Sequence, residues 1–376
     1  MEDFERRLRN GLGELENAHR HRSLERASGV SFVDNDYLAL SRSPEILRAG
    51  ARAAEVFGAG SRGSRLLGGH SALFEDVENK IADFFGAPAA LLFSSGYLAN
   101  LGVITALSEF FDGIVSDERN HASLIDGIRL SGLPKTIVKH QDWAAAPAQG
   151  RPLVVAEALY SMDGDFVDEA ALAGYLERSD GFLVLDEAHS GGVFRENGRG
   201  WSAPWRDWKR MAVVVTFGKA FGVGGAAVLG TSELKDWILN RARSFVYTTA
   251  PPPWVVGAIG QSLEVVGRSQ TLREELWDRA RRVRSILREA PGQERLEWEG
   301  WAGASPIIPF RVTGELKALR FSESMRKLGI YLRAIRYPTV PAGEERVRLS
   351  LSLSVSRENT ETMAKEMVKA WTAFLS

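Results

Sequence analysis

The apolar positions of the first 24 residues recur at helical spacing, with charged side chains between them. They are Phe4, Leu8, Leu12 and Leu15. This spacing predicts an amphipathic helix over residues 2–24. The same periodicity predicts two more helices, one over 44–57 and one over 71–85. A short strand is expected at 30–33, between the first two helices.

Between residues 89 and 230 the pattern changes to short apolar runs that alternate with longer amphipathic stretches. Strands are predicted at 89–93, 113–116, 135–138, 153–156, 182–185 and 212–215. Helices are predicted at 96–107, 123–130 and 168–178. Uninterrupted apolar strands that alternate with helices are typical of a mostly parallel sheet covered on both faces. The predicted fold class is therefore α/β, and the ligands of such sheets bind beyond the C-terminal ends of the strands.

After residue 230 helices come first and strands follow. Helices are predicted at 231–243, 252–267, 270–289, 314–328 and 357–374, and strands at 305–311 and 346–353. This order is typical of a smaller α+β domain. We therefore expect an N-terminal helix and short strand over 1–35, a large domain over 36–245, and a C-terminal domain over 246–376.

Composition narrows the class of function. The chain has 376 residues, a net charge of −1 and no cysteine. The balanced charge gives no reason to expect nucleic acid or an anionic membrane as a partner, and the lack of cysteine excludes disulfides and cysteine-ligated zinc. His19 and His21 alternate with arginines, which indicates a basic patch, and no metal site is expected. Because the sequence has neither a signal-peptide core nor an apolar run of about 18 residues, a cytoplasmic location is expected.

A lysine and an aspartate each follow one of the buried apolar runs. Lys219 comes shortly after the run at 212–215 and is followed by a glycine-rich segment, while Asp186 directly follows the run at 182–185. Burial lowers the pKa of a lysine and leaves a nucleophilic amine, which can form a Schiff base with a carbonyl compound. Lys219 alone fits a packed structural lysine equally well. The pair favours pyridoxal phosphate (PLP), because an aspartate keeps the pyridine nitrogen of PLP protonated.

A turn of small residues lies between the strand predicted at 89–93 and the helix predicted at 96–107. It contains Ser95, Gly96 and Tyr97. Such a turn presents free backbone N–H groups to an anion, and the helix dipole adds to the attraction. Taken alone it fits an ordinary strand-to-helix turn, but together with Asp186 and Lys219 it is predicted to bind the phosphate of PLP.

The sequence resembles the α-oxoamine synthases, a family of fold-type I PLP-dependent enzymes. The matching segments run in family order and are 34–40, 92–100, 120–124, 161–165, 186–189, 216–219, 334–341 and 346–349. The resemblance implies a large domain with a mostly parallel, seven-stranded sheet flanked by helices, followed by a smaller domain. It also implies a homodimer with shared active sites.

The resemblance further implies roles for residues around the cofactor. His121 would stack on the PLP ring, and Ser161 and His189 would hydrogen-bond its phenolic oxygen. Thr216 would contact the phosphate, as would Thr248, which in the family reaches the cofactor of the partner subunit. Lys219, Asp186 and His121 would be the catalytic residues.

Substrate-binding residues are expected outside the central segments. The resemblance implies that Arg348 binds the carboxylate of the amino acid, although Arg346 shares the same face of a predicted strand. It also implies that an arginine after the N-terminal helix, Arg22 or its neighbour Arg20, meets the far end of the acyl substrate. Asn35 is expected to contact substrate as well.

Within the family, the sequence resembles most the branch that joins L-alanine to a pimeloyl thioester, with loss of CO2, in biotin biosynthesis. The thioester could be carried by CoA or by an acyl carrier protein. Glycine C-acetyltransferase, serine palmitoyltransferase and 5-aminolevulinate synthase share the fold and stay open as alternatives. So does an inactive partner subunit of such an enzyme.

Overall fold

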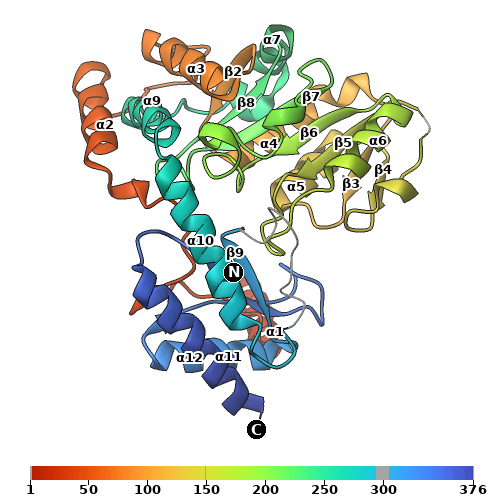
Figure 1. The fold of residues 1–376 in the computed structure, drawn as a ribbon. Coiled ribbons are helices and arrows are strands. Elements are labelled where there is room, and N and C mark those ends of the chain that lie inside the picture. The colour runs from red at the N-terminus through yellow and green to blue at the C-terminus, as the bar shows by residue number, and fades with distance from the viewer. Residues whose placement is uncertain (1, 149, 294–304, 376) are drawn as a thin grey trace. The chain divides into compact units, whose positions relative to one another are not determined.

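The structure, a computed structural model, describes residues 2–148, 150–293 and 305–375. The chain forms two compact units. The first comprises Met1–Asp34, Met162–Gly164 and Leu276–Ser376, and the second comprises Asn35–Ser161 and Asp165–Glu275. The domain boundary predicted after residue 245 falls inside the second unit. The reason is that α9 (Pro253–Gly267) packs with α2 (Pro44–Phe57) and α3 (Ala72–Phe85) beside the sheet of that unit (Figure 1).

The second unit is built around a sheet of seven strands in the order β2-β8-β7-β6-β5-β3-β4. The strands are β2 (Ala89–Phe93), β3 (Gly113–Asp117), β4 (Lys135–Val138), β5 (Pro152–Glu157), β6 (Phe182–Asp186), β7 (Met211–Thr216) and β8 (Ala226–Gly230). Strand β8 runs antiparallel to both of its neighbours, and all other neighbouring pairs are parallel. The mostly parallel sheet predicted from the apolar runs is confirmed.

Helices bury the faces of this sheet. They include α4 (Gly96–Leu107), α5 (Ala122–Ser131), α6 (Glu169–Ser179), α7 (Ser232–Arg241) and the short α8 (Arg243–Val246). Helix α4 is apolar on nearly every side because it contacts β7 and β8 as well as α5, α7 and α8. Its Val103 and Ile104 are fully buried in a core shared with Leu124 of α5. This packing fixes the N-terminal ends of α4 and α5 at the edge where the parallel strands end.

Strands β7 and β8 form an antiparallel hairpin, and Lys219 lies in its loop. The N–H of Phe217 donates to the carbonyl of Gly225 (2.9 Å) and closes the loop. Gly222 has φ +68°, and a Cβ atom there would lie 2.4 Å from the backbone nitrogen of Ser41. Only glycine therefore lets this loop pack against the segment around residue 41. The sequence pattern did not predict β8, because its small residues resemble the glycine-rich turn before it.

The first unit combines helices with short strands. Its three-stranded antiparallel sheet has the order β11-β12-β9, and a separate pair joins β1 to β10. The strands are β1 (Val30–Ser31), β9 (Ile307–Arg311), β10 (Ile330–Tyr331), β11 (Ala334–Ile335) and β12 (Arg346–Ser350). The helices are α1 (Glu2–Asn17), α11 (Glu315–Lys327) and α12 (Arg357–Leu375), and α10 (Gln270–Leu287) continues into this unit from the second. The predicted α+β character of the C-terminal region is confirmed.

The N-terminal helix differs from its prediction. Helix α1 ends at Asn17, short of the predicted residue 24, and its apolar positions Phe4 and Leu8 are 66% and 52% exposed. The last apolar position of the helical pattern is Leu15, and the helix ends before His19, which adopts φ +54°. Among the described residues, no helix combines the length and apolarity that crossing a bilayer requires.

Candidate active site

The C-terminal ends of β3, β5, β6 and β7 and the N-terminal end of α4 surround a cavity of about 280 Å³. The structure brings together at this cavity most of the residues that the sequence predicted for the cofactor. Those that line it are Ser95, Gly96, Tyr97, His121, Asp186, His189, Thr216 and Lys219. They come from loops that follow different strands, as expected for a parallel sheet.

Asp186 is the last residue of β6 and is 5% exposed. One carboxylate oxygen accepts a hydrogen bond from the side-chain amide of Asn100 (2.7 Å), and the other accepts from the N–H of Ala188 (2.8 Å). Two fixed donors on different elements hold the carboxylate in one orientation. The side chain is therefore a preorganised anion at the cavity wall.

Lys219 begins a chain of polar contacts within the second unit. Its Nζ lies 2.8 Å from Nε2 of His189, and Nδ1 of the same imidazole lies 2.6 Å from the hydroxyl of Tyr37. That hydroxyl donates to Oδ1 of Asn35 (3.2 Å). If Tyr37 donates to Asn35, it accepts from Nδ1–H of His189, which leaves the Nε2 lone pair to accept from the lysine ammonium. Two aromatic residues thus fix the position of the amine.

His121 stands at the N-cap of α5, directly after the turn that follows β3. Its Nδ1 accepts from the N–H of Ser123 (3.2 Å), so its proton belongs on Nε2. Burial lowers the pKa of His121, the charge of Lys219 lowers it further, and the charge of Asp186 opposes both. The ring is therefore neutral at pH 7 and presents an uncharged aromatic face.

The N-terminus of α4 also lines the cavity. Ser95 is the N-cap, and its hydroxyl accepts from the N–H of Leu98 (3.3 Å). A Cβ atom on Gly96 would lie 2.5 Å from Cγ2 of Thr216, so glycine lets Thr216 pack closely against this end of the helix. Tyr97 is 42% exposed, and its hydroxyl bonds the carboxylate of Asp126. The first turn of α4 can therefore receive an anion.

Comparison with known proteins identifies the family. The model of the class I and II aminotransferases matches residues 28–367. The 8-amino-7-oxononanoate synthase of Chromobacterium violaceum is 40% identical over 367 residues, which covers 92% of this chain and 93% of that protein. The chain belongs to the 8-amino-7-oxononanoate synthase family.

Solved structures agree with this assignment. The 8-amino-7-oxononanoate synthase of Francisella tularensis superposes with a TM-score of 0.79 at 27% identity, covering 93% of this chain and 99% of that one. The serine palmitoyltransferase of S. paucimobilis, with bound PLP and myriocin, gives 0.85 at 25% identity, covering 98% and 97%. The 8-amino-7-oxononanoate synthase family shares its fold with that enzyme. This chain is a PLP-dependent acyltransferase.

The cavity described above fits PLP, the cofactor of the 8-amino-7-oxononanoate synthase family. It offers an amine in Lys219, a fixed carboxylate in Asp186 and an uncharged aromatic ring in His121. Gly96 lies at the N-terminus of α4, where a phosphate is favoured. An amine, a carboxylate, an uncharged ring and a helix N-terminus thus lie around one cavity.

Sequence reasoning missed Glu157, a fully buried carboxyl group that also lines the cavity. It ends β5 and lies directly beside Asp186 in the parallel register. Burial raises the pKa of Glu157 well above its usual value, and the charge of Asp186 raises it further. The sequence signal that could have predicted Glu157 is the same as for Asp186, namely a carboxylate directly after four apolar residues.

Other predicted residues lie elsewhere in the described structure. Ser161 and Thr248 belong to the second unit but are not among the residues that line the cavity. Asn35 also belongs to the second unit. It accepts a hydrogen bond from Tyr37, which links it to the chain of polar contacts that begins at Lys219. Arg22 and Arg348 belong to the first unit. Their roles at the site stay predictions.

Proposed function

We propose that this enzyme joins L-alanine to a pimeloyl thioester, with loss of CO2, and forms 8-amino-7-oxononanoate. The names of similar proteins support these substrates. The observation that carries the proposal is that Lys219 and Asp186 line one cavity from the ends of neighbouring strands β7 and β6. The match to a serine palmitoyltransferase makes another amino acid and acyl thioester the alternative.

Residues of the cavity would hold the cofactor. Lys219 would bind PLP covalently, and Asp186 would keep the pyridine nitrogen protonated. When bound, PLP supplies an electron sink for the negative charge that develops at the α carbon of the amino acid. His121 would lie against the ring face, while His189 and Ser161 would contact the phenolic oxygen. The phosphate contacts would come from Ser95, Gly96, Tyr97, Thr216 and, from the partner subunit, Thr248.

The amine of Lys219 would also move the proton. Lys219 would be the general base that takes the α proton of alanine. The 2.8 Å contact with His189 supports this role, because a fixed partner holds the amine near one position. Tyr37 in turn restrains the imidazole from its other side.

Arg348 would bind the carboxylate of alanine. Arg346 and Arg348 point to the same face of β12, so spacing alone does not separate them. The guanidinium of Arg346 already contacts Asp163 (2.7 Å) and Glu344 (3.0 Å). Two carboxylate partners leave Arg346 poorly suited to bind a third. Asn35 would contact substrate from the second unit.

Arg22 would bind the distal carboxylate of the pimeloyl chain. It lines a cavity of about 260 Å³ in the first unit together with Arg333 and Arg336, and it donates to the hydroxyl of Thr339 (3.2 Å). Burial lowers the pKa of Arg336, and the charges of Arg22 and Arg333 lower it further. Arg20 also lines this cavity, but its guanidinium pairs with Glu315 (3.2 Å). Glu25 also lines this cavity and pairs with Arg333 (2.9 Å), and the ion pair of Arg20 with Glu315 supports Arg22 over Arg20.

The carrier of the thioester would be CoA or an acyl carrier protein, and the enzyme would act as a homodimer. The match to the Chromobacterium violaceum enzyme does not choose between the two carriers. Size-exclusion chromatography with light scattering would test the dimer.

The decisive experiment is product mass after incubation with L-alanine, glycine or L-serine and a panel of acyl thioesters. The expected product is 8-amino-7-oxononanoate from L-alanine and the pimeloyl thioester. A matched pair of substrates, pimeloyl and octanoyl, tests Arg22. Arg22→Ala should weaken the use of pimeloyl thioester far more than the use of octanoyl thioester, with Arg20→Ala as the control. Product formed only from L-serine or glycine would refute the proposed substrates.

A further inference from the structure

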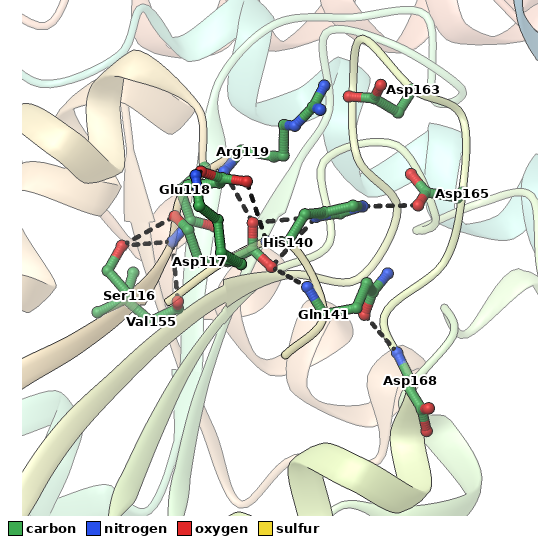
Figure 2. A network of polar contacts seen from close by, with 12 residues as sticks. Ser116, Asp117, Glu118, Arg119, His140, Gln141, Val155, Asp163, Asp165 and Asp168 are labelled. Atoms are coloured by element: carbon green, nitrogen blue, oxygen red, sulfur yellow. Dashed lines mark hydrogen bonds and ion pairs between the residues drawn. The ribbon is translucent and has the colours of Figure 1, made fainter. Parts of the chain in front are cut away.

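No role was predicted from the sequence for a network of polar side chains around His140. His140 follows β4 and lies between two carboxylates (Figure 2). Its Nδ1 is 3.0 Å from Oδ1 of Asp117, the last residue of β3, and its Nε2 is 2.7 Å from Oδ2 of Asp165. The exposed fractions of the three side chains are 19%, 0% and 8%. The ring of Tyr160 meets the imidazole edge-to-face at 4.5 Å.

On one side the network holds the turn that leads to His121. Besides the imidazole, the carboxylate of Asp117 accepts from the N–H of Arg119 (2.7 Å) and from the N–H of Gln141 (2.9 Å). Asp117 lies four residues before His121, so these bonds fix the backbone path from β3 into α5. The path of this backbone segment determines where His121 lies at the cavity.

On the other side the network holds the loop that carries Ser161. The base of this loop is closed by the N–H of Tyr160, which donates to the carbonyl of Asp165 (2.9 Å). The side chain of Gln141 adds two bonds, one to the carbonyl of Phe166 (2.6 Å) and one from the N–H of Asp168 (2.8 Å). Figure 2 shows His140 and Gln141 side by side, facing this loop.

An imidazolium is the group that satisfies both carboxylates. The hydrogen bonds and charges of Asp117 and Asp165 raise the pKa of His140 to about 10, although burial opposes them. Both ring nitrogens therefore donate at neutral pH. Without the cation, two buried carboxylates would lack their shared partner, which is strongly unfavourable.

We propose that His140 is a positioning residue, which holds the His121 turn and the Ser161 loop in one arrangement and thereby fixes the orientation of the PLP ring. The proposal rests on PLP as cofactor and does not depend on which amino acid or acyl thioester reacts. It assigns to His140 no contact with substrate or cofactor.

The test compares His140→Gln and His140→Phe with the wild type. The matched control is Lys139→Ala, because Lys139 pairs with Glu118 (2.9 Å) between the same two segments but is 82% exposed. The readouts are visible circular dichroism per bound PLP, the Kd for PLP, and far-UV circular dichroism for folding. If His140→Phe leaves a tenth of the molecules competent, the Kd for PLP rises about tenfold. The dichroism should fall from wild type through the glutamine to the phenylalanine variant, and Lys139→Ala should match the wild type.

If His140 has a purely structural role, a different result is expected. In that case the His140 variants melt at lower temperature, but each bound PLP gives the wild-type visible dichroism and the wild-type Kd, and the proposal is refuted. Should His140→Phe fail to fold, Asp165→Asn decides, since it keeps the bond from His140 to Asp117. The proposal then requires reduced dichroism, and an unchanged signal overturns it. Because these readouts need no acyl substrate, they stand even if the proposed substrates prove wrong.

Discussion

Raising the pH should remove a proton, and with it the positive charge, from the imidazolium of His140 that joins Asp117 to Asp165. The pKa of His140 is raised from 6.5 to about 10, so the native state binds one proton more than the unfolded chain between these values. The stabilisation is fully present below pH 6.5 and is lost as the pH rises through about 10. The pKa of Asp117 is lowered, so that carboxylate is ionised throughout this range. The pKa of Tyr160, which also faces the ring, is raised well above 10 and keeps the phenol neutral.

The magnitude follows from the same pKa. At roughly 1.4 kcal/mol for each pH unit, the full interaction is on the order of 5 kcal/mol. Because a histidine of pKa 6.5 is already mostly neutral at pH 7 when unfolded, about 4 kcal/mol remains to be lost above pH 7. More than half of this should disappear between pH 7 and pH 9.

The assay is a titration of the histidine carbon-bound protons by NMR. The sequence has six histidines, and His140→Gln identifies the signal of His140 by its absence. The expected signal keeps the chemical shift of an imidazolium up to about pH 9. In parallel, the urea midpoint of the wild type should fall more steeply with pH than that of the variant. A His140 signal that titrates near pH 6.5, or equal slopes for the two proteins, would refute the electrostatic argument.

Four further predictions concern residues proposed to bind the cofactor or the substrate. Lys219→Ala should abolish both turnover and the visible absorption of bound PLP, and a variant that keeps both would contradict the covalent role of Lys219. Asp186→Asn should leave PLP bound but slow α-proton removal by several powers of ten, at about 1.4 kcal/mol for each factor of ten; deuterium exchange at the α carbon of alanine measures this. Gly96→Ala should weaken PLP binding in a fluorescence titration, because its Cβ would lie 2.5 Å from Thr216, and an unchanged Kd would place the phosphate elsewhere. Arg348→Lys should raise the KM for alanine, since lysine lacks the bidentate fork, and initial rates that give an unchanged KM would favour the neighbouring arginine.

Much of the second unit could be predicted from the sequence because its strands are buried on both faces. Such strands are continuous apolar runs, and β2 and β4 were predicted to the residue. Strands β5 and β6 extend one residue further than predicted, to Glu157 and Asp186, because a terminal carboxylate interrupts the apolar pattern. Strand β8 was not predicted, because its alanine and glycine residues give little apolar signal.

The candidate site was predictable from sequence patterns only where charges follow buried apolar runs. Lys219 and Asp186 each follow such a run, and the pair, more than either residue alone, indicated the cofactor. The contact of Tyr37 with His189 joins residues 152 positions apart, and no local sequence pattern predicts such a pair. Glu157 shows a further limit, because the same signal as Asp186 was present but no cofactor atom required a second carboxylate.

The reversal of β8 has a consequence for how the cavity assembles during folding. The loop that holds Lys219 joins strands that are neighbours in both sequence and space, so only a short loop must close to form it. The parallel pairs that bring Asp186 and His121 to the same edge require long crossovers, whose closure entropy is larger. We therefore expect the hairpin to form early and the parallel strands to dock onto it later. The backbone around Lys219 would then be placed by contacts within the stretch 211–230, and the later docking would add the contact with His189 that fixes the amine.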